Sequence, residues 1–271
     1  MEPFVSAEWL VKRIGEVKVA DVRWYLDGRS GRAAYEGGHI PGAVFVDLER
    51  WLAAPAIPGG GRHPLPEPEV FAQGMSQAGI GDTDTVVAYD DAGGVIAARL
   101  VWMLRVTGHQ AAVLDGGIAS WEGGLSRQYV EPSTARFTAA PWPAGRLATI
   151  EDARSPGHLV LDARDAERFR GDSEPVDPRA GHIPGARSLP CRGNLGPDGR
   201  MLDVAELRGR FERAGVVEAE KVISYCGSGV TACHNLLALE HAGFGAGRLF
   251  PGSWSEYSRR EDLPVATGDI S

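Results

Sequence analysis

The stretch "KVISYCGSGVTACHNLLALEHAG", Lys221 to Gly243, decides the fold expected for this chain. It begins with a β-branched and aromatic segment, which indicates a strand, and continues through a cysteine and a loop of small residues into a helix pattern. Gly243 follows the last apolar residues and suits the C-terminal end of that helix. In open α/β sheets ligands bind beyond the carboxyl ends of the strands, so Cys226 lies where a functional site is expected.

The sequence contains this unit twice. "VVAYD" (86–90) recurs as "VISYC" (222–226), and "GGHIPGAVFVDL" (37–48) recurs as "AGHIPGARSLP" (180–190). Self-similarity at a distance of this size indicates two copies of one supersecondary unit. The first copy carries Asp90 where the second has its cysteine, so the two copies are not chemically equivalent.

Each copy alternates short apolar strands with amphipathic helices. This pattern predicts an α/β fold with two similar domains, each a mainly parallel sheet with helices on both faces. The separation of equivalent residues is smaller at Asp90 and Cys226 than at the GHIPG turns, which places an insertion in the first copy, at the Pro/Gly-rich segment 53–68. We predict an N-terminal domain over 1–125, a linker over 126–146 and a C-terminal domain over 147–271.

The composition is typical of a globular protein and restricts its partners. Hydrophobic residues make up 43% and charged residues 24% of the chain, and no apolar run is long enough to span a membrane. The formal net charge of −8 argues against nucleic acid and anionic membranes as partners, because like charges repel. The N-terminus lacks a secretory signal and the chain has three cysteines, so we expect free thiols, a cytoplasmic location and no metal site.

The loop after the predicted strand is suited to activating a thiol. A thiol must ionise to act as a nucleophile, and backbone N–H groups at the start of a helix favour the anion. Gly227 and Gly229 allow the backbone to curl inward, while Ser228 and Thr231 add hydroxyl donors. We therefore expect Cys226 to lie within a ring of donors that favours a thiolate or a bound persulfide.

Three other interpretations of Cys226 are weighed against this one. A cysteine at the end of a strand can be a buried, inert core residue, but the Gly-rich loop that follows it favours a functional role. A cysteine phosphatase needs an arginine at the sixth position after the cysteine, where this chain has Ala232. A dinucleotide or P-loop site needs a glycine signature that does not occur after the strand.

The sequence resembles the tandem-domain rhodaneses, a family of thiosulfate and 3-mercaptopyruvate sulfurtransferases. The resemblance is carried by "CGSGVTA", by the two "GHIPGA" turns and by "LDGGIASW" (114–121), whose looser copy is "FPGSWSEY" (250–257). It covers essentially the whole chain. It implies two tandem rhodanese-like domains, of which the C-terminal one is catalytic and the N-terminal one, with Asp90, is not.

The resemblance implies sulfur transfer without a cofactor. Cys226 would take a sulfane sulfur from a small anionic donor, form a persulfide, and pass the sulfur to a thiophilic acceptor such as cyanide, a thiol or a thioredoxin-like protein. Gly227-Ser228 after the cysteine resembles the 3-mercaptopyruvate enzymes, whereas thiosulfate enzymes tend to carry cations there. The alternatives are thiosulfate:cyanide transfer as the main activity, or a persulfide carrier or sensor with little turnover.

The resemblance also assigns roles to residues outside the loop. Arg168 matches an arginine that binds the anionic group of the donor, and Arg179 is the candidate for a second one, although Val176 stands where some members have arginine. Asp162 matches an aspartate beside the site, with catalysis or support of an arginine as its two candidate roles. Trp24 matches a tryptophan that lines the cleft from the N-terminal domain. The alternative roles for these residues are ion pairing and core packing.

The remaining expectations concern the loop and the other candidate groups. His39 and His182 are expected to hydrogen-bond the backbone of their turns, with proton transfer by His39 as the alternative. Asp90 is expected to cap a helix. Cys191 and Cys233 are expected to be structural. The loop residues expected to line the donor site are Gly227, Gly229, Val230, Thr231 and Ala232.

Overall fold

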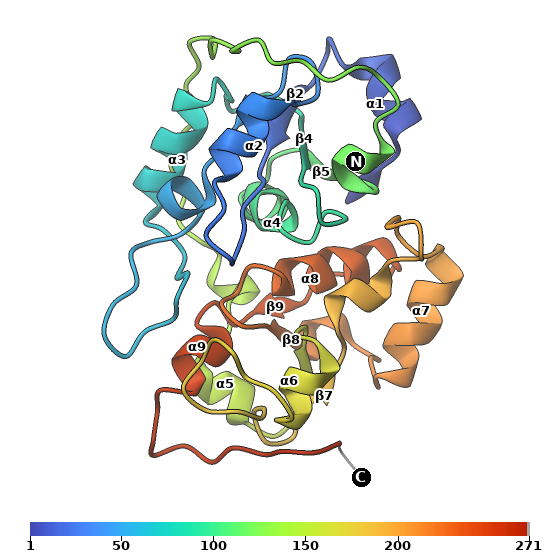
Figure 1. Cartoon of the computed structure of the whole chain (residues 1–271). Coiled ribbons are helices and arrows are strands. Elements are labelled where there is room, and N and C mark those ends of the chain that lie inside the picture. Colours follow the sequence, from blue (N-terminus) through green and yellow to red (C-terminus); the bar gives the residue numbers. More distant parts are fainter. Residues whose placement is uncertain (270–271) are drawn as a thin grey trace. The chain divides into compact units, whose positions relative to one another are not determined.

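The structure, a computed structural model, describes residues 1–269 and divides into two compact units (Figure 1). Unit 1 comprises residues 1–54, 65–142 and 196–201. Unit 2 comprises residues 55–64, 143–195 and the rest of the chain from residue 202. The segment 55–64, which the sequence places inside the first copy of the repeat, therefore belongs to the second unit by its contacts.

Unit 1 is an α/β unit with a parallel sheet. Its strands are β1 (Phe4–Val5), β2 (Lys18–Asp21), β3 (Val44–Phe45), β4 (Val86–Tyr89) and β5 (Ala111–Leu114). Its helices are α1 (Ala7–Arg13), α2 (Gly31–Gly37), α3 (Pro68–Gln77) and α4 (Ala98–Val106), with short turns of helix at Leu48–Leu52 and Gly117–Ser120. The strand order is β1-β5-β4-β2-β3, and every ladder between these strands is parallel.

Both faces of this sheet are covered. All four residues of β4 are buried, and successive side chains of a strand point to opposite faces. Val87 and Tyr89 pack with Leu10 of α1 in one core cluster, and α4 packs against β4 and β5. A continuous apolar strand in a parallel sheet is the pattern expected when helices cover both faces.

Unit 2 repeats this architecture with a four-stranded sheet in the described residues. Its strands are β6 (Leu159–Asp162), β7 (Arg187–Ser188), β8 (Val222–Tyr225) and β9 (Arg248–Leu249). Its helices are α5 (Ile150–Arg154), α6 (Ala166–Arg170), α7 (Val204–Arg213), α8 (Ala232–His241) and α9 (Ser253–Tyr257), with 3-10 turns at Ala144–Arg146, Cys191–Asn194 and Ala219–Lys221. The order is β7-β6-β8-β9, again with parallel ladders, so the predicted fold class is confirmed.

The strand and helix predicted around Cys226 are present. The segment "VISY" forms β8, and α8 begins at Ala232, two residues later than the predicted start near Val230. The residues between Cys226 and Thr231 form bends, so the helix begins only after the loop has turned. Gly243 follows α8 with φ +78°, the left-handed conformation that ends helices, as predicted.

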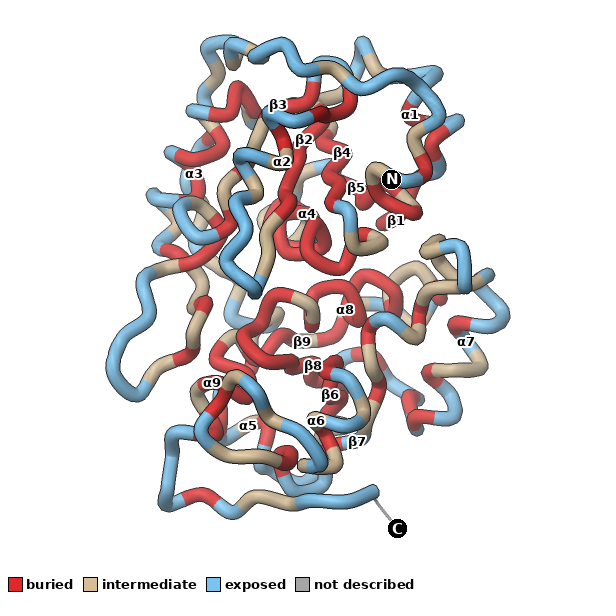
Figure 2. Tube along the Cα trace, viewed as in Figure 1, coloured by how far each residue is buried: buried red, intermediate tan, exposed pale blue. Residues whose placement is uncertain are grey.

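One core cluster of unit 2 joins its sheet to α5, α6 and α9. Ile223 and Tyr225 of β8 pack with Phe250, Trp254 and Tyr257, and all five are at most 2% exposed. Figure 2 shows β8 and α8 as continuous buried segments. Each side chain of this size contributes roughly 1.5–3 kcal/mol when fully buried, so this cluster holds the end of β8, and with it Cys226, in a fixed place. Among residues 1–269 no helix is long and apolar enough to cross a membrane.

Candidate active site

Cys226 lies directly after β8 and is held by its own loop and by the start of α9. Its side chain is 2% exposed, and the backbone N–H of Gly229 donates to Sγ at 3.1 Å. The N–H of Cys226 donates to Oγ of Ser253 at 3.1 Å, and its carbonyl accepts from the N–H of Trp254 at 2.9 Å. The thiol is therefore a buried group at a defined position, with a backbone donor directed at its sulfur.

Gly229 makes the curl of the loop possible. Its φ is +78°, which disfavours any side chain, and a Cβ at this position would lie 2.5 Å from the carbonyl oxygen of Pro251. The loop can therefore bring the Gly229 N–H onto the sulfur only because residue 229 has no side chain.

The corresponding loop of unit 1 closes around Asp90. The carboxylate accepts hydrogen bonds from the N–H groups of Ala92, Gly94, Ile96 and Ala97 at 2.7–2.8 Å. Burial raises the pKa of Asp90, and these four donors oppose that shift by stabilising the carboxylate. These N–H groups belong to the loop that leads into α4, whose N-cap residue is Ala97 and has no side-chain cap, so Asp90 stabilises the loop rather than capping the helix itself. A carboxylate in this place holds no sulfur.

Ser228 forms a hydrogen bond that the sequence did not reveal. Its Oγ lies 2.8 Å from Nδ1 of His63, and both residues are buried. His63 comes from segment 55–64, which the Arg62 N–H anchors to Oγ of Ser255 at 2.9 Å. The only sequence signal was the insertion itself, which brings a histidine and an arginine with it.

Arg168 lies beside the cysteine loop and is surrounded by carboxylates. Its guanidinium donates to Glu174 at 2.7 and 3.2 Å and to Asp177 at 3.2 Å. A Cβ built on Gly227 would lie 3.5 Å from Nη1 of Arg168, so the residue after the cysteine faces this guanidinium. Burial acts to raise the pKa of Glu174, but the hydrogen bonds from Arg168 and the Asp177 N–H hold it below its usual value.

Asp162 is used to orient Arg164. Both of its carboxylate oxygens accept from Arg164, at 2.6–3.1 Å, and Asp162 is fully buried. Arg164 also donates to the carbonyl of Gly181 at 2.7 Å and to Glu174 at 3.2 Å. Of the two roles considered from the sequence, these contacts favour the support of an arginine, and a catalytic role for Asp162 stays a prediction.

The position of Arg179 argues against the role proposed for it. Its guanidinium donates to four backbone carbonyls, those of Tyr257, Ser258, Arg260 and Leu263, at 2.7–3.1 Å. Donors that are already committed to buried carbonyls are not available to a substrate. These contacts favour a structural role for Arg179, which fixes the segment after α9, and a role in binding the donor stays a prediction.

The other predicted site residues lie in the cysteine loop, at the start of α8 and in unit 1. Val230 and Ala232 are buried at the base of the loop, and Thr231 is the residue before the first turn of α8. Trp24 belongs to unit 1, where its indole N–H donates to Glu49 at 3.1 Å. The contacts of these residues with a donor stay predictions.

Cys191 and Cys233 are buried and form no disulfide within residues 1–269, and burial raises the pKa of Cys191 to about 12. The turn histidines bond backbone carbonyls of the preceding helices, those of Tyr35 in α2 and Phe169 in α6, and not the backbone of their own turns. His39 and His182 each make this hydrogen bond at 2.8 Å through Nδ1. Burial lowers the pKa of His182, in keeping with a neutral, packed ring. Within residues 1–269, no three His, Cys, Asp or Glu side chains gather closely enough to hold a metal ion.

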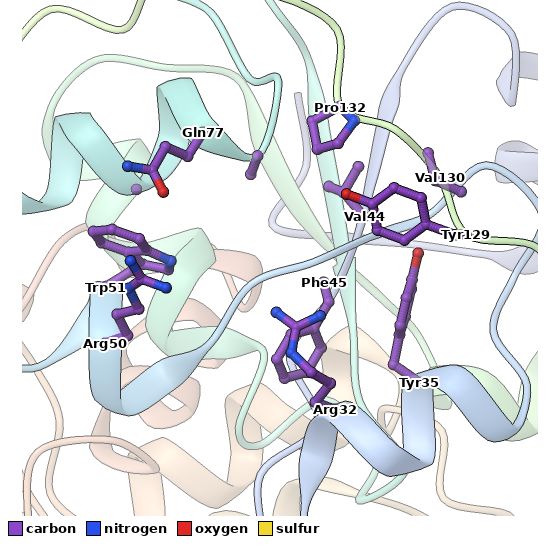
Figure 3. A pocket seen from close by; sticks show the side chains of 12 residues that line it. Arg32, Tyr35, Val44, Phe45, Arg50, Trp51, Gln77, Tyr129, Val130 and Pro132 are labelled. Carbon is purple, nitrogen blue, oxygen red and sulfur yellow. The ribbon is translucent and has the colours of Figure 1, made fainter.

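Unit 1 has a separate hollow of about 150 Å³ (Figure 3). Arg32 stacks on Phe45 at 4.8 Å and Arg50 on Trp51 at 4.4 Å along its wall, and Tyr129 lies across from them. None of the residues selected from the sequence lines this hollow. Because all three cysteines of the chain belong to unit 2, it offers no thiol for covalent chemistry.

Comparison with known proteins agrees with the repeat. The profile of the rhodanese-like domain matches the chain twice, over residues 6–123 and 147–260. A Pseudomonas aeruginosa protein with the provisional name 3-mercaptopyruvate sulfurtransferase is 44% identical over 98% of both chains. A Mycobacterium tuberculosis protein, SseB, with the provisional name thiosulfate sulfurtransferase, is 42% identical over 93% of this chain and 91% of its own.

Solved structures give the same result. The 3-mercaptopyruvate sulfurtransferase SseA from Escherichia coli is 34% identical in sequence and superimposes with a TM-score of 0.81, over 94% of this chain and all of its own. The 3-mercaptopyruvate sulfurtransferase from Leishmania major is 31% identical and superimposes with a TM-score of 0.84, over 97% of this chain and 76% of its own.

Proposed function

This chain belongs to the rhodanese family of sulfurtransferases, with two rhodanese-like domains, and we propose that it transfers sulfur through a persulfide on Cys226, with 3-mercaptopyruvate as the favoured donor. The observation that supports this choice most strongly is the 2.8 Å hydrogen bond between Ser228 and His63 beside the thiol. The names of several relatives point to the same donor.

The first step is a substitution at the donor sulfur. The Cys226 thiolate attacks the sulfur of 3-mercaptopyruvate, a new S–S bond forms and the C–S bond breaks. Its electron pair stays on carbon as the enolate of pyruvate, which takes up one proton. The products are pyruvate and a Cys226 persulfide, whose sulfurs lie where the Gly229 N–H can stabilise negative charge.

The Ser228–His63 pair can supply the proton that this step requires. When Nδ1 of His63 carries a proton, the Ser228 hydroxyl gives its own proton to the leaving enolate and regains one from Nδ1. Thiosulfate would release sulfite instead, whose charge calls for a cation rather than a proton. The pair therefore favours a carbon leaving group.

The second step returns the enzyme to its starting state. An acceptor such as cyanide, a small thiol or a reduced thioredoxin-like protein attacks the outer sulfur, the S–S bond breaks and the Cys226 thiolate is released. No cofactor takes part in either step. We place the reaction in the cytoplasm, since no disulfide joins the three cysteines within residues 1–269 and reducing conditions keep thiols in that state.

Thiosulfate as the main donor is the second candidate. It is favoured by the provisional name of the M. tuberculosis relative and by Arg168, whose guanidinium beside Gly227 suits a sulfonate as well as a carboxylate. A persulfide carrier with little turnover is the third, since the buried loop would protect a bound sulfur.

Side-by-side kinetics with the two donors test the proposal. We expect Ser228→Ala and His63→Gln to lower kcat with 3-mercaptopyruvate by about 100-fold, because general-acid catalysis contributes about that factor or more, and to change turnover of thiosulfate by less than about fivefold. Thiocyanate formed from cyanide and pyruvate released from the donor are the two readouts.

Cys226→Ser is the matched control and should form no persulfide with either donor, as judged by the intact mass. A large preference of the wild-type protein for thiosulfate would reverse the assignment of the donor. A stable added sulfur with negligible turnover of both donors would favour the carrier instead.

A further inference from the structure

Segment 55–64 brings a second guanidinium to the cysteine loop, that of Arg62. Its Nη1 donates to Oδ1 of Asp177 at 2.7 Å, and its backbone N–H is fixed to Ser255. The same segment is held at Gly60, whose carbonyl accepts from Arg259 at 2.8 Å. Arg62 is therefore held at several points, in contrast to a solvated surface arginine.

Asp177 joins Arg62 and Arg168 at one place. Its Oδ1 accepts from Arg62 and its Oδ2 from Arg168, at 2.7 and 3.2 Å. A Cβ built on Gly227 would lie 3.2 Å from Nη2 of Arg62 and 3.5 Å from Nη1 of Arg168. The residue directly after the cysteine thus faces both guanidiniums at once.

Arg62 retains a donor that nothing in the described protein uses. Its Nε is buried and has no hydrogen-bond partner among residues 1–269, although the side chain as a whole is 23% exposed. A buried N–H without a partner is destabilising, and a bound anion would remove that cost. Arg179 differs, since four carbonyls use its guanidinium.

We infer that Arg62, together with Arg168, binds the anionic group of the sulfur donor and selects donors that carry a carboxylate close to the transferred sulfur. The inference rests on the proposed function for the identity of the donor. Asp177 accepts a hydrogen bond from each guanidinium and so holds the two cations together when no ligand is bound. The carboxylate of the donor accepts from the N–H groups that Asp177 does not use. Planar guanidiniums suit such a group because they can donate to both of its oxygens.

The inference gives segment 55–64 two roles in one site. His63 contacts Ser228 for proton transfer, while the neighbouring Arg62 recognises the anion. Arg62 also provides the second donor-binding arginine that the sequence pattern led us to expect at Arg179. Arg62 is thus a substrate-binding residue that lies more than 160 positions before the nucleophile in the sequence.

The first test does not depend on sulfur transfer. The rate at which Cys226 is alkylated is measured with iodoacetate, which is an anion, and with iodoacetamide, which is its neutral analogue. We expect Arg62→Gln to lower the ratio of the two rates by about tenfold, since one charge-assisted hydrogen bond contributes roughly that factor. With 3-mercaptopyruvate, KM should rise by a similar factor while kcat stays within about threefold.

Arg62→Lys and Arg179→Gln are the comparison variants. Arg62→Lys keeps the positive charge beside Asp177 but removes the planar guanidinium that can donate to both oxygens of a carboxylate. The ratio of the iodoacetate rate to the iodoacetamide rate should therefore fall, but by less than in Arg62→Gln. Arg179→Gln should lower the melting temperature and leave the alkylation ratio unchanged. If Arg62→Gln does not fold, Arg62→Lys decides the question.

The alkylation ratio tests the role of Arg62, and turnover of the two donors tests the proposed function, so the two can fail independently. An unchanged alkylation ratio and an unchanged KM in a folded Arg62 variant overturn the inference, even if the wild-type protein turns over 3-mercaptopyruvate. A ratio that depends on Arg62 supports anion recognition by this residue, even if neither donor is turned over.

Discussion

At the scale of single residues, Ser253 shows how the position of the nucleophile is set. It is fully buried and has a φ of +53°, which non-glycine residues rarely adopt. Its hydroxyl accepts from the Cys226 N–H and donates to the carbonyl of Phe250 at 2.9 Å. The corresponding residue of unit 1 is Gly117, which adopts the same left-handed conformation with φ +59°. Unit 2 therefore has backbone strain at this position, and in return the Ser253 hydroxyl binds the backbone of the nucleophile.

Two substitutions at Ser253 separate the strain from the hydrogen bonds. Ser253→Ala keeps the strain and leaves the Cys226 N–H without its partner, so we expect a loss of about 2 kcal/mol in the free energy of unfolding. Ser253→Gly loses the same hydrogen bonds but removes a left-handed penalty of about 1 kcal/mol, so its loss should be smaller. Urea denaturation measures both, and an alanine variant more stable than the glycine variant would contradict this account.

The residues near Cys226 differ in how far the sequence could reveal them. Cys226, Ser228 and Arg168 were selected because their motifs are local, and the structure places all three in one region of unit 2. For Arg179, a spacing could not show that four carbonyls surround the guanidinium. His63 had no local motif and was missed.

At the scale of elements, α8 is the helix that follows the cysteine loop, and it is almost entirely buried. Residues 232–239 are all buried, among them His234, for which burial lowers the pKa to about 3. Its Nδ1 lies 3.4 Å from Nδ2 of Asn194, in the 3-10 turn Cys191–Asn194. A helix with no solvent-exposed face has a weak 3.6-residue pattern, so its start was harder to predict than its presence.

The pH dependence of stability follows from His234. The folded-state pKa lies below that of the unfolded chain, near 6.5, so between these values the unfolded state binds the proton and the folded state does not. Stability is therefore fully present above about pH 6.5 and falls by about 1.4 kcal/mol per pH unit as the pH drops toward 3.

Comparison of His234→Gln with the wild-type protein isolates this contribution, because the other groups titrate alike in both. We expect the difference in unfolding free energy between wild type and variant to shrink steadily below pH 6.5 and to stay constant above it. His158→Gln, at a residue outside the buried helix, should show the wild-type slope. A pH-independent difference for His234→Gln would contradict a buried neutral imidazole.

At the scale of the whole molecule, the site depends on a segment that connectivity places in the other repeat. Residues 55–64 are flanked on both sides by unit 1, yet their contacts lie in unit 2. A Cβ on Gly61 would lie 2.9 Å from the backbone of Gly252, which shows how closely this segment packs before α9. Unit 2 therefore has a site built from two distant parts of the sequence.

Replacing residues 55–64 with a Gly/Ser linker of equal length tests this dependence. We expect turnover of 3-mercaptopyruvate to fall below that of His63→Gln, because Arg62 and His63 are lost together and Asp177 loses one partner. The melting temperature should fall by only a few degrees, because the buried core of each unit is untouched. Turnover equal to that of the wild type would show that the segment is dispensable.

The sequence by itself determined the repeat, the α/β class, the strand before Cys226 and the loop after it. These features depend on local pattern: alternation of apolar segments, β-branched content and glycines at a tight curve. Only the tertiary structure decided that Arg62 faces the cysteine loop beside Arg168 and that His63 pairs with Ser228. Such contacts join residues far apart in the chain, and their choice depends on packing and on which polar groups are already satisfied, neither of which a linear pattern records.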